Sequence, residues 1–277
     1  MTALSPTLSA ESGPTPSDPG LDRREAFLID LAREAGRLAQ RAFSGAETLA
    51  YRMKGPQDFL TVTDAAVEEL VQNRLQSAFP EDGFLGEESG GVLSPQIWVV
   101  DPIDGTANFA RRIPHYCVSI AFVSHGVIAL GAVFDPAHDE LYFARQGRGA
   151  TRNGKPVRVS DVRDAHAACV ELGWSTRVPN SDYLDALAGI LKAGANARRG
   201  ATGALGLAYV ADGRSDGYAE LHMQPWDCLA GLLLVEEAGG RVSPYLENGG
   251  LAKGGPVLAV APGAADLMQS ATGIALK

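Results

Sequence analysis

The sequence is poor in cysteine and in aromatic residues. Its three cysteines, Cys117, Cys169 and Cys228, are scattered, and no Cys-x-x-Cys pair occurs. We interpret them as small buried side chains in a reducing cytosol rather than as a disulfide framework. Aromatic residues make up only 7% of the chain, so the core should be built from aliphatic side chains and close backbone contacts at glycine.

Positive charge and long apolar runs are also scarce. Lysine and arginine number 24 against 33 aspartates and glutamates, which gives a net charge of −9. This balance argues against a nucleic-acid partner, which requires clustered basic residues. No apolar run approaches the roughly 20 residues of a membrane-spanning helix, and the N-terminus lacks the pattern of a signal peptide. We therefore expect a cytoplasmic protein without a membrane partner.

Two common catalytic patterns are missing. No Gly-x-Ser-x-Gly segment is present, so a serine nucleophile on a strand-to-helix turn is not expected. The histidines show no paired ligand spacing, which argues against a zinc site. They are His115, His125, His138, His166 and His222.

The chain divides into a tail and two halves of a layered α/β (α+β) fold. Residues 1–20 carry four prolines among Ser, Thr and Gly and are predicted to be a disordered tail. Residues 21–160 form an N-terminal α+β half and residues 161–277 a C-terminal α/β half, with a weak boundary near Ser160. Hydrophobic spacing predicts helices at 21–43, 64–79, 182–192, 203–211 and 225–238, with a further helix at the C-terminus. Strands are predicted at 84–86, 97–100, 117–123, 127–134, 140–144, 168–172, 217–221 and 257–261, with a turn or mobile loop at 53–59 and a hairpin turn at Asn153-Gly154.

The segment Trp98-Val99-Val100-Asp101-Pro102-Ile103-Asp104-Gly105-Thr106 is the most informative acidic patch. A buried strand leads into Asp101, which the following proline keeps extended. Asp104 comes three residues later, so both carboxylates and the Ile103 carbonyl can face one point, a hard oxygen site that suits Mg2+. The backbone N–H groups after Gly105 would open a helix and could bind phosphate. The alternative is that both aspartates are turn and cap residues.

Three other acidic patches have similar alternatives. They are Thr61-Val62-Thr63-Asp64, Gly86-Glu87-Glu88-Ser89 and Pro225-Trp226-Asp227. Asp64 and Asp227 fall at predicted helix starts, where a carboxylate can serve as a cap worth about 1 kcal/mol. Glu87 can be an ordinary solvated residue. A purely structural role is reasonable for each acidic patch alone. It is much less reasonable for all four patches at once.

The patches together closely resemble the inositol monophosphatase family. Its first signature, Trp-x-x-Asp-Pro-Ile-Asp-Gly-Thr-x-Asn-Phe, matches Trp98 to Phe109, and its second, Trp-Asp-x-Ala-Gly, matches Trp226 to Gly231 with one extra residue before Ala230. The resemblance extends from about Leu21 onward. It implies an αβαβα sandwich of the sugar-phosphatase type, and a phosphatase that hydrolyses small phosphate monoesters with metal-activated water.

The resemblance also assigns roles to residues. Glu87, Asp101 and the Ile103 carbonyl resemble ligands of a first Mg2+, and Asp101, Asp104 and Asp227 ligands of a second. A third, weaker Mg2+ would lie near Glu87 with Asp64 in its outer shell, so two to three ions are implied per site. Thr106, with Glu87 and Asp64, resembles the group that orients the attacking water. The amides of Gly105 and Thr106 would receive the phosphate.

The substrate is less defined than the chemistry. Glu220 matches a position that reads sugar-ring hydroxyls, although a surface charge at a strand end is nearly as good an interpretation. Gly203 and Thr202 are further candidates to line the pocket, and Lys54 is either a substrate or metal-site contact or a free surface lysine. Inositol monophosphate is the leading substrate. Histidinol phosphate, fructose 1,6-bisphosphate and adenosine 3′,5′-bisphosphate are alternatives.

The resemblance further implies lithium inhibition and a homodimer. The alternative from another functional class is a binding scaffold that keeps this fold but has lost catalysis. Such a scaffold would be indicated by lost metal ligands, whereas Glu87, Asp101, Asp104 and Asp227 are all present. The small phosphorylated metabolite is thus the main partner that the sequence predicts.

Overall fold

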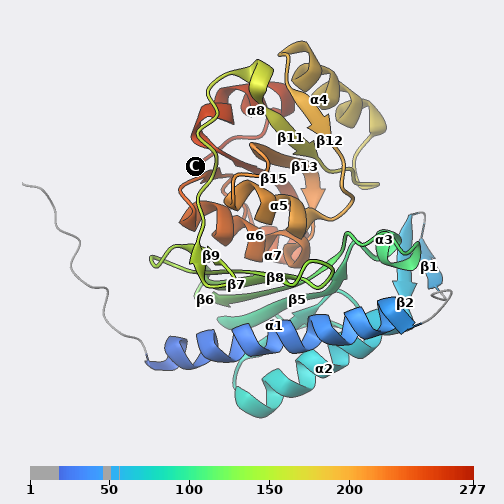
Figure 1. The fold of residues 1–277 in the computed structure, drawn as a ribbon. Coiled ribbons are helices and arrows are strands. Elements are labelled where there is room, and N and C mark those ends of the chain that lie inside the picture. The colour runs from blue at the N-terminus through green and yellow to red at the C-terminus, as the bar shows by residue number, and fades with distance from the viewer. Residues whose placement is uncertain (1–18, 46–50, 56) are drawn as a thin grey trace, which may run out of the picture.

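The computed structural model describes residues 19–45, 51–55 and 57–277, and its layers alternate between helices and sheets. Figure 1 shows α1 and α2 on one side, then an eight-stranded sheet, a layer with α5 and α6, a five-stranded sheet, and α4 with α8 on the far side. The predicted layered α/β fold with an αβαβα order is confirmed. The predicted tail lies outside the described residues, except for its last two residues, which begin α1.

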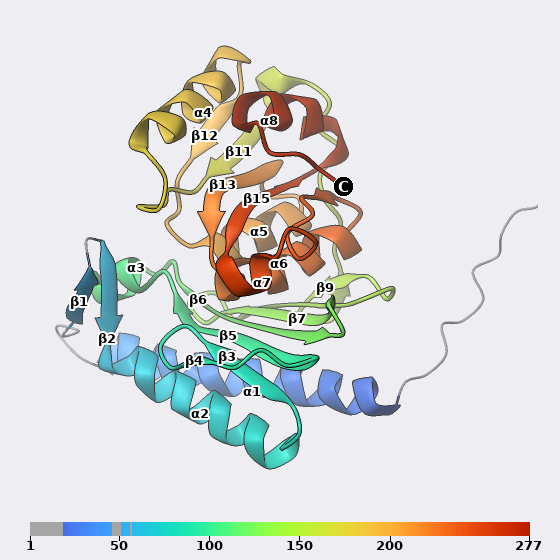
Figure 2. The ribbon, with the colours of Figure 1, turned by 180° about the vertical axis from the view of Figure 1, so that it is seen from behind.

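Two long helices form the first layer. α1 (Pro19–Gly45) and α2 (Val62–Ala78) lie across the outer face of the eight-stranded sheet (Figure 2). α1 buries one stripe of residues at helical spacing, including Leu28, Leu31 and Ala35, against this sheet. Its other faces are charged. No helix in the described part of the chain is both long enough and apolar enough to span a bilayer.

The large sheet has the strand order β10-β9-β8-β7-β6-β5-β3-β4. Within this sheet only β3 and β5 pair in parallel, and every other pair of neighbouring strands is antiparallel. The predicted Asn153-Gly154 hairpin turn is confirmed, since it joins β9 to β10 with positive φ at both residues. The strands are β3 (Gly83–Gly86), β4 (Gly90–Gly91), β5 (Gln96–Asp104), β6 (Cys117–Ser124), β7 (Val127–Asp135), β8 (Glu140–Arg145), β9 (Ala150–Arg152) and β10 (Lys155–Pro156).

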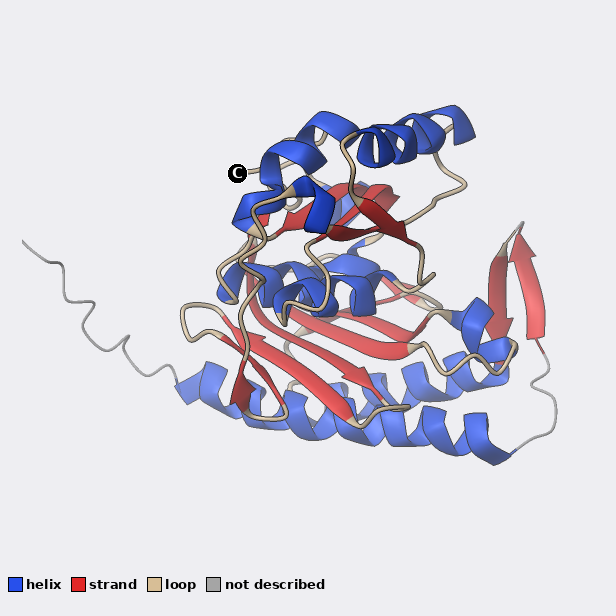
Figure 3. Cartoon of the chain, turned by 45° about the horizontal axis from the view of Figure 1, so that its top comes forward, coloured by secondary structure: helices blue, strands red, loops and turns tan. Residues whose placement is uncertain are grey.

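Two apolar helices lie between the sheets, as the separation of blue and red layers in Figure 3 shows. They are α5 (Gly203–Ala211) and α6 (Pro225–Glu237), and every residue of α5 is buried. Small residues permit this packing: a Cβ on Gly131 of β7 would lie 2.9 Å from the Ala230 backbone, and one on Gly231 would lie 2.4 Å from the Leu207 side chain. The Ala-Gly pair of the second signature therefore serves packing.

The five-stranded sheet has the order β12-β11-β13-β15-β14, with helices α4 and α8 on its outer face. Its strands are β11 (Cys169–Leu172), β12 (Asn196–Arg198), β13 (Gly217–Met223), β14 (Arg241–Val242) and β15 (Gly255–Val260). The remaining helices are α3 (Thr106–Ala110), α4 (Asn180–Lys192), α7 (Gly250–Lys253) and α8 (Ala265–Thr272), with short 3-10 turns at Ala165–Ala167 and Pro262–Ala264. The large sheet lies wholly before residue 160 and this one wholly after it.

The turn predicted at 53–59 is present at Gln57, but most of that segment is strand rather than loop. The chain there forms an antiparallel pair, β1 (Tyr51–Gly55) and β2 (Asp58–Thr61). The Tyr51 and Phe59 rings pack across the two strands at 5.1 Å between centroids, and the Arg111 guanidinium lies 4.4 Å from the Phe59 ring centre. These contacts, made from different segments, stabilise a hairpin whose sequence reads locally as a loop.

Candidate active site

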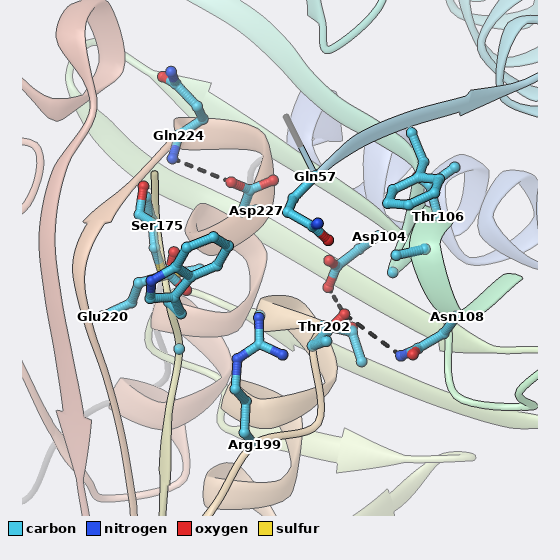
Figure 4. A pocket seen from close by; sticks show the side chains of 18 of the residues that line it. Gln57, Asp104, Thr106, Asn108, Ser175, Arg199, Thr202, Glu220, Gln224 and Asp227 are labelled. Atoms are coloured by element: carbon cyan, nitrogen blue, oxygen red, sulfur yellow. Dashed lines mark hydrogen bonds between the residues drawn. The ribbon is translucent and has the colours of Figure 1, made fainter. Parts of the chain in front are cut away.

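The acidic patches meet at one cavity of about 450 Å3. Its wall includes the end of β5, the start of α3, the start of α5, strand β13 and the start of α6. In Figure 4, Asp104 and Asp227 face the cavity from the large-sheet side and the α6 side, while Glu220 lies on the opposite wall. Segments from both halves of the chain therefore build one site.

The end of β5 is shaped by a register shift between Asp101 and Asp104. The Ile103 N–H donates to Asp101 Oδ1 at 2.9 Å, so the chain turns around this carboxylate. Gly105 then adopts φ +90°, where a side chain is disfavoured, and precedes the short helix α3. The Asp-Pro-Ile-Asp-Gly segment thus brings two buried carboxylates and the first amides of a helix, which lack intrahelical partners, to one place.

Asp104 is fixed by the neighbouring helix α5. Its Oδ2 accepts hydrogen bonds from the Thr202 hydroxyl at 2.5 Å and the Ala204 N–H at 2.7 Å. Thr202 was predicted to bind substrate. It does line the cavity, but its hydroxyl is engaged with Asp104 and the residue is 3% exposed. This contact spans nearly a hundred residues and gives Thr202 a positioning role.

Asp64 closes the base of the site from α2. Thr61, not Thr63, is the N-cap of this helix, and both its N–H, at 2.8 Å, and its hydroxyl donate to Asp64 Oδ2. Asp64 is therefore part of a capping box, as the structural alternative proposed. Its Oδ1 remains directed at the Thr106 hydroxyl, which lies 3.1 Å away and also 2.9 Å from the Ile103 carbonyl. The capping and active-site interpretations are thus compatible.

Glu87 lies in the tight turn between β3 and β4. The carboxylate of Glu68 on α2 fixes this turn by accepting from the Glu88 N–H at 2.9 Å and the Ser89 N–H at 2.7 Å. Lys54 approaches from β1, with its ammonium 3.2 Å from Glu87 Oε1 and 2.9 Å from Glu88 Oε1. Lys54 is therefore an ion-pair partner at the site rather than a free surface lysine.

Asp227 is the third residue of α6. Gln224 is the N-cap, and its N–H donates to Asp227 Oδ2 at 3.2 Å, so this aspartate is also in a capping box. Pro225 starts the helix with a suitable φ and no N–H to satisfy. The local signals that begin α6 thus also place Asp227 at the cavity.

The carboxylates strongly influence one another. Burial raises the pKa of Asp101 well above its usual value, and the charges of Glu87, Asp104 and Asp227 raise it further. Burial likewise raises the pKa of Asp227, with Glu87 and Asp104 adding to the effect. Burial also raises the pKa of Glu87 to about 7, although the Lys54 charge opposes this. Four negative groups therefore share a desolvated region, which favours a bound cation or proton.

The donor set fits Mg2+ in chemistry, since it consists of carboxylates and a backbone carbonyl. Within the described residues, however, no three Asp, Glu, His or Cys side chains already surround one point as a ready-made metal cage. Like charges repel, and all four carboxylates are also tied to neighbours: Asp101 to the backbone, Asp104 to α5, Asp227 to the Gln224 N–H and Glu87 to Lys54. The ligand assignment therefore stays a prediction, which rests on donor type and shared burial.

The opposite wall of the cavity carries two further carboxylates. Glu220 on β13 accepts a hydrogen bond from the Tyr218 hydroxyl at 2.7 Å, and burial raises its pKa to about 7. Gly173 leaves room for Glu220 and for the Tyr218 hydroxyl, since a Cβ there would lie 2.0 Å from Glu220 Oε2 and 2.4 Å from the Tyr218 oxygen. Glu171 is 1% exposed, and its Oε2 has no hydrogen-bond partner in the described structure. Such a pair suits a ligand that donates hydroxyl hydrogen bonds.

The structure brings most of the predicted residues to this cavity. Glu87, Asp104, Gly105, Thr106, Thr202, Gly203, Glu220 and Asp227 all line it, while Asp101 and Asp64 lie behind and touch its lining residues. The sequence analysis missed Glu68, Glu171 and Tyr218. Glu68, one helical turn after Asp64, carries a local signal of spacing, but Glu171 and Tyr218 lie in strands and could not be distinguished from core residues.

The layered α/β fold and the carboxylate-rich cavity beside a helix start fit the class expected from the sequence, that of phosphatases. A family model described as the inositol monophosphatase family matches residues 21–273, and the chain belongs to this family.

Named relatives support the same assignment. The chain is 38% identical over 222 residues to Nus factor SuhB of Xylella fastidiosa, covering 79% of this chain and 81% of the relative. It is 38% identical over 245 residues to inositol-1-monophosphatase of Mesorhizobium japonicum, covering 83% and 91%. The crystal structure of extragenic suppressor protein suhB from Bartonella henselae superposes with a TM-score of 0.83 at 34% identity, covering 90% of this chain and 98% of that one.

Proposed function

We propose that the protein is a Mg2+-dependent phosphatase that hydrolyses a small phosphate monoester, with inositol monophosphate as the leading substrate. The observation that carries the proposal is the convergence of Glu87, Asp101, Asp104 and Asp227 in one desolvated region beside the Gly105 turn. A purely structural role would not favour gathering four like charges around a cavity, because they lose hydration and repel one another, and among the described residues only Glu87 of the four is paired with a cation.

Each group has a separate task in this proposal. Glu87, Asp101, Asp104, Asp227 and the Ile103 carbonyl would hold Mg2+, which would supply charge neutralisation and an acidified water. The free amides at Gly105 and Thr106 would bind phosphate oxygens as charge builds up on them. The Thr106 hydroxyl, which can donate its single proton to either Asp64 or the Ile103 carbonyl, leaves an oxygen lone pair free to orient the attacking water.

The cavity wall favours a substrate with several hydroxyl groups. Glu220 and Glu171 line the cavity from adjacent strands, and Glu171 Oε2 has no hydrogen-bond partner among the described residues, with the Arg198 guanidinium 4.0 Å away. Carboxylates at a cavity wall can accept hydroxyl hydrogen bonds, and a hydrogen bond to a charged group contributes about 1.5–3 kcal/mol. This supports a polyol phosphate over phosphates of simple alcohols.

The test is phosphate release with Mg2+ from inositol 1-phosphate, histidinol phosphate, fructose 1,6-bisphosphate and adenosine 3′,5′-bisphosphate. Asp104→Asn is the matched variant, because it keeps the size and the hydrogen bonds of the side chain but removes one charge. We expect turnover by the wild type and its loss, by about 100-fold or more, in the variant. No turnover of any of the four, in protein that binds Mg2+, would contradict the proposal.

A non-catalytic role is the second candidate, since several similar proteins are named Nus factor. A protein of this kind would tolerate Asp104→Asn without loss of function in cells, whereas a phosphatase would not.

A further inference from the structure

Asn108 is the asparagine of the first signature, and the chemistry proposed above does not use it. It is the third residue of α3, lines the main cavity and is 8% exposed. Its N–H donates to the Gly105 carbonyl at 2.9 Å, and its own carbonyl accepts from the Ile113 N–H at 2.9 Å. The main chain of Asn108 is therefore part of the turn that presents the Gly105 and Thr106 amides.

The Asn108 side chain reaches from this turn to two other segments. Its Nδ2 donates to the His115 carbonyl, just before β6, and to the Gly200 carbonyl, just after β12, both at 2.9 Å, with the Ala201 carbonyl 3.5 Å away. Because these three groups are all acceptors, only the NH2 end of the side chain can face them. Figure 4 shows Asn108 directed toward the Thr202 segment. One amide thus joins the α3 turn to the C-terminal half of the chain.

The segment that this amide holds, residues 200–202, also orients Asp104. Its last residue, Thr202, donates its hydroxyl proton to Asp104 Oδ2, and its first residue donates its N–H to Glu171 Oε1 at 2.7 Å. The middle residue, Ala201, adopts φ +59°, a left-handed conformation that a residue with a side chain keeps only where its surroundings hold it. The orientation of Asp104 therefore depends on the hydrogen bonds that fix this short segment.

Gly105 is packed between the same neighbours. A Cβ on Gly105 would lie 3.1 Å from the His115 carbonyl oxygen and 3.3 Å from the Thr202 Cβ. The α3 turn, the residues before β6 and the 200–202 segment thus meet with little space between them. Without the Asn108 donors, two carbonyl groups at this junction would lose their hydrogen-bond partner, which favours movement of the segments that carry them.

We propose that Asn108 is a positioning residue that holds the expected metal ligand Asp104 and the phosphate-binding amides of Gly105 and Thr106 in one fixed arrangement. The proposal rests on the proposed phosphatase function and adds a residue to its site. Asn108 touches neither the ion nor the reacting phosphate in this arrangement. It acts on Asp104 through the 200–202 segment and on the amides through its own turn.

Two variants remove the donors of Asn108. Asn108→Ala deletes the amide, and Asn108→Leu nearly keeps its shape without any donor. The matched control is Tyr142→Phe, which removes another hydrogen bond between the two halves of the chain, from the Tyr142 hydroxyl to Asp212 at 3.3 Å, outside the cavity wall. Mg2+ affinity would be measured by calorimetric titration without substrate, and kcat and KM with inositol 1-phosphate at saturating Mg2+.

We expect both Asn108 variants to bind Mg2+ about 10- to 100-fold more weakly and to have a lower kcat with a nearly unchanged KM, whereas the control matches the wild type. In Asn108→Ala/Thr202→Val, the loss of Mg2+ affinity should be at least about twofold smaller than the product of the single losses, because both changes act on the same carboxylate. Losses that multiply fully, or a raised KM with unchanged Mg2+ affinity, would overturn the proposal.

Hydrogen exchange separates this proposal from the phosphatase function. In metal-free protein, the peptide that spans residues 200–206 includes the Ala204 N–H bonded to Asp104, and it should exchange faster in Asn108→Ala than in the wild type or Tyr142→Phe. Unchanged exchange would overturn the positioning role even in an active enzyme. Faster exchange in a protein that hydrolyses no substrate would support the positioning role and contradict only the proposed function.

Discussion

Replacing Thr202 with valine tests whether this residue positions a metal ligand or contacts substrate. Valine has nearly the same shape as threonine but lacks the hydroxyl, so packing at this buried position is retained while one hydrogen bond to Asp104 Oδ2 is lost. The Ala204 N–H still donates to the same oxygen at 2.7 Å. Asp104 would keep its approximate place but lose part of its orientation.

The size of the effect follows from the type of bond. A hydrogen bond to a charged group contributes about 1.5–3 kcal/mol, and loss of an outer partner of a metal ligand lowers metal affinity about 10- to 100-fold. We therefore expect the Mg2+ concentration at half-maximal activity to rise by that factor. Thr202→Ser keeps the hydroxyl and should remain within about threefold of the wild type, a difference of less than about 0.7 kcal/mol.

Phosphate release would be measured against Mg2+ at fixed substrate, and then against substrate at saturating Mg2+. The positioning role predicts that the first curve shifts and the second changes little. An unchanged Mg2+ curve with a raised KM would refute the reasoning, since it would mean that Thr202 contacts substrate, as the sequence alone suggested.

Three further predictions concern other parts of the site. Glu68→Ala removes the acceptor for the Glu88 and Ser89 N–H groups, so the Mg2+ concentration at half-maximal activity should rise about 10-fold or more. Glu68→Gln keeps an acceptor oxygen and should recover part of this loss. Equal behaviour of the two variants would contradict the prediction. Burial raises the pKa of Glu220 to about 7, and the hydrogen bond from Tyr218 opposes this rise. Tyr218→Phe removes that hydrogen bond, so the pKa of Glu220 should increase further. The pH below which KM for a polyol phosphate increases should therefore move upward, and a pH profile of KM that is unchanged or moves downward would argue against Glu220 as the hydroxyl acceptor. Mg2+ at about 100 times its Kd should raise the free energy of unfolding by about 2.7 kcal/mol in urea titrations, and this gain should shrink in Asp104→Asn; no gain in the wild type would argue against a metal site in the folded state.

The sequence was sufficient for the elements with a strong local cause. The Asn153-Gly154 turn, the strand before Asp101 and the helix that Pro225 begins are all encoded within a few residues, because turn chemistry and hydrophobic period act locally. The long first signature likewise indicated the family. Within this signature the structure separates site residues from packing residues. The Trp98 indole N–H donates to Asp82 at 2.9 Å, and neither residue lines the cavity.

Only the tertiary structure determined what each side chain contacts. Thr202 and Asp104 are nearly a hundred residues apart, and their hydrogen bond exists because α5 packs against the end of β5. The hairpin at β1 and β2 forms because Phe59 finds Tyr51 and Arg111, a contact that local propensity cannot show. Trp174 and Arg199 also come from different loops, and the Arg199 guanidinium lies 5.7 Å from the Trp174 ring centre. Local sequence thus determined the elements and the donor types, whereas burial, pKa values and the partners of each carboxylate depend on long-range packing, which no short segment encodes.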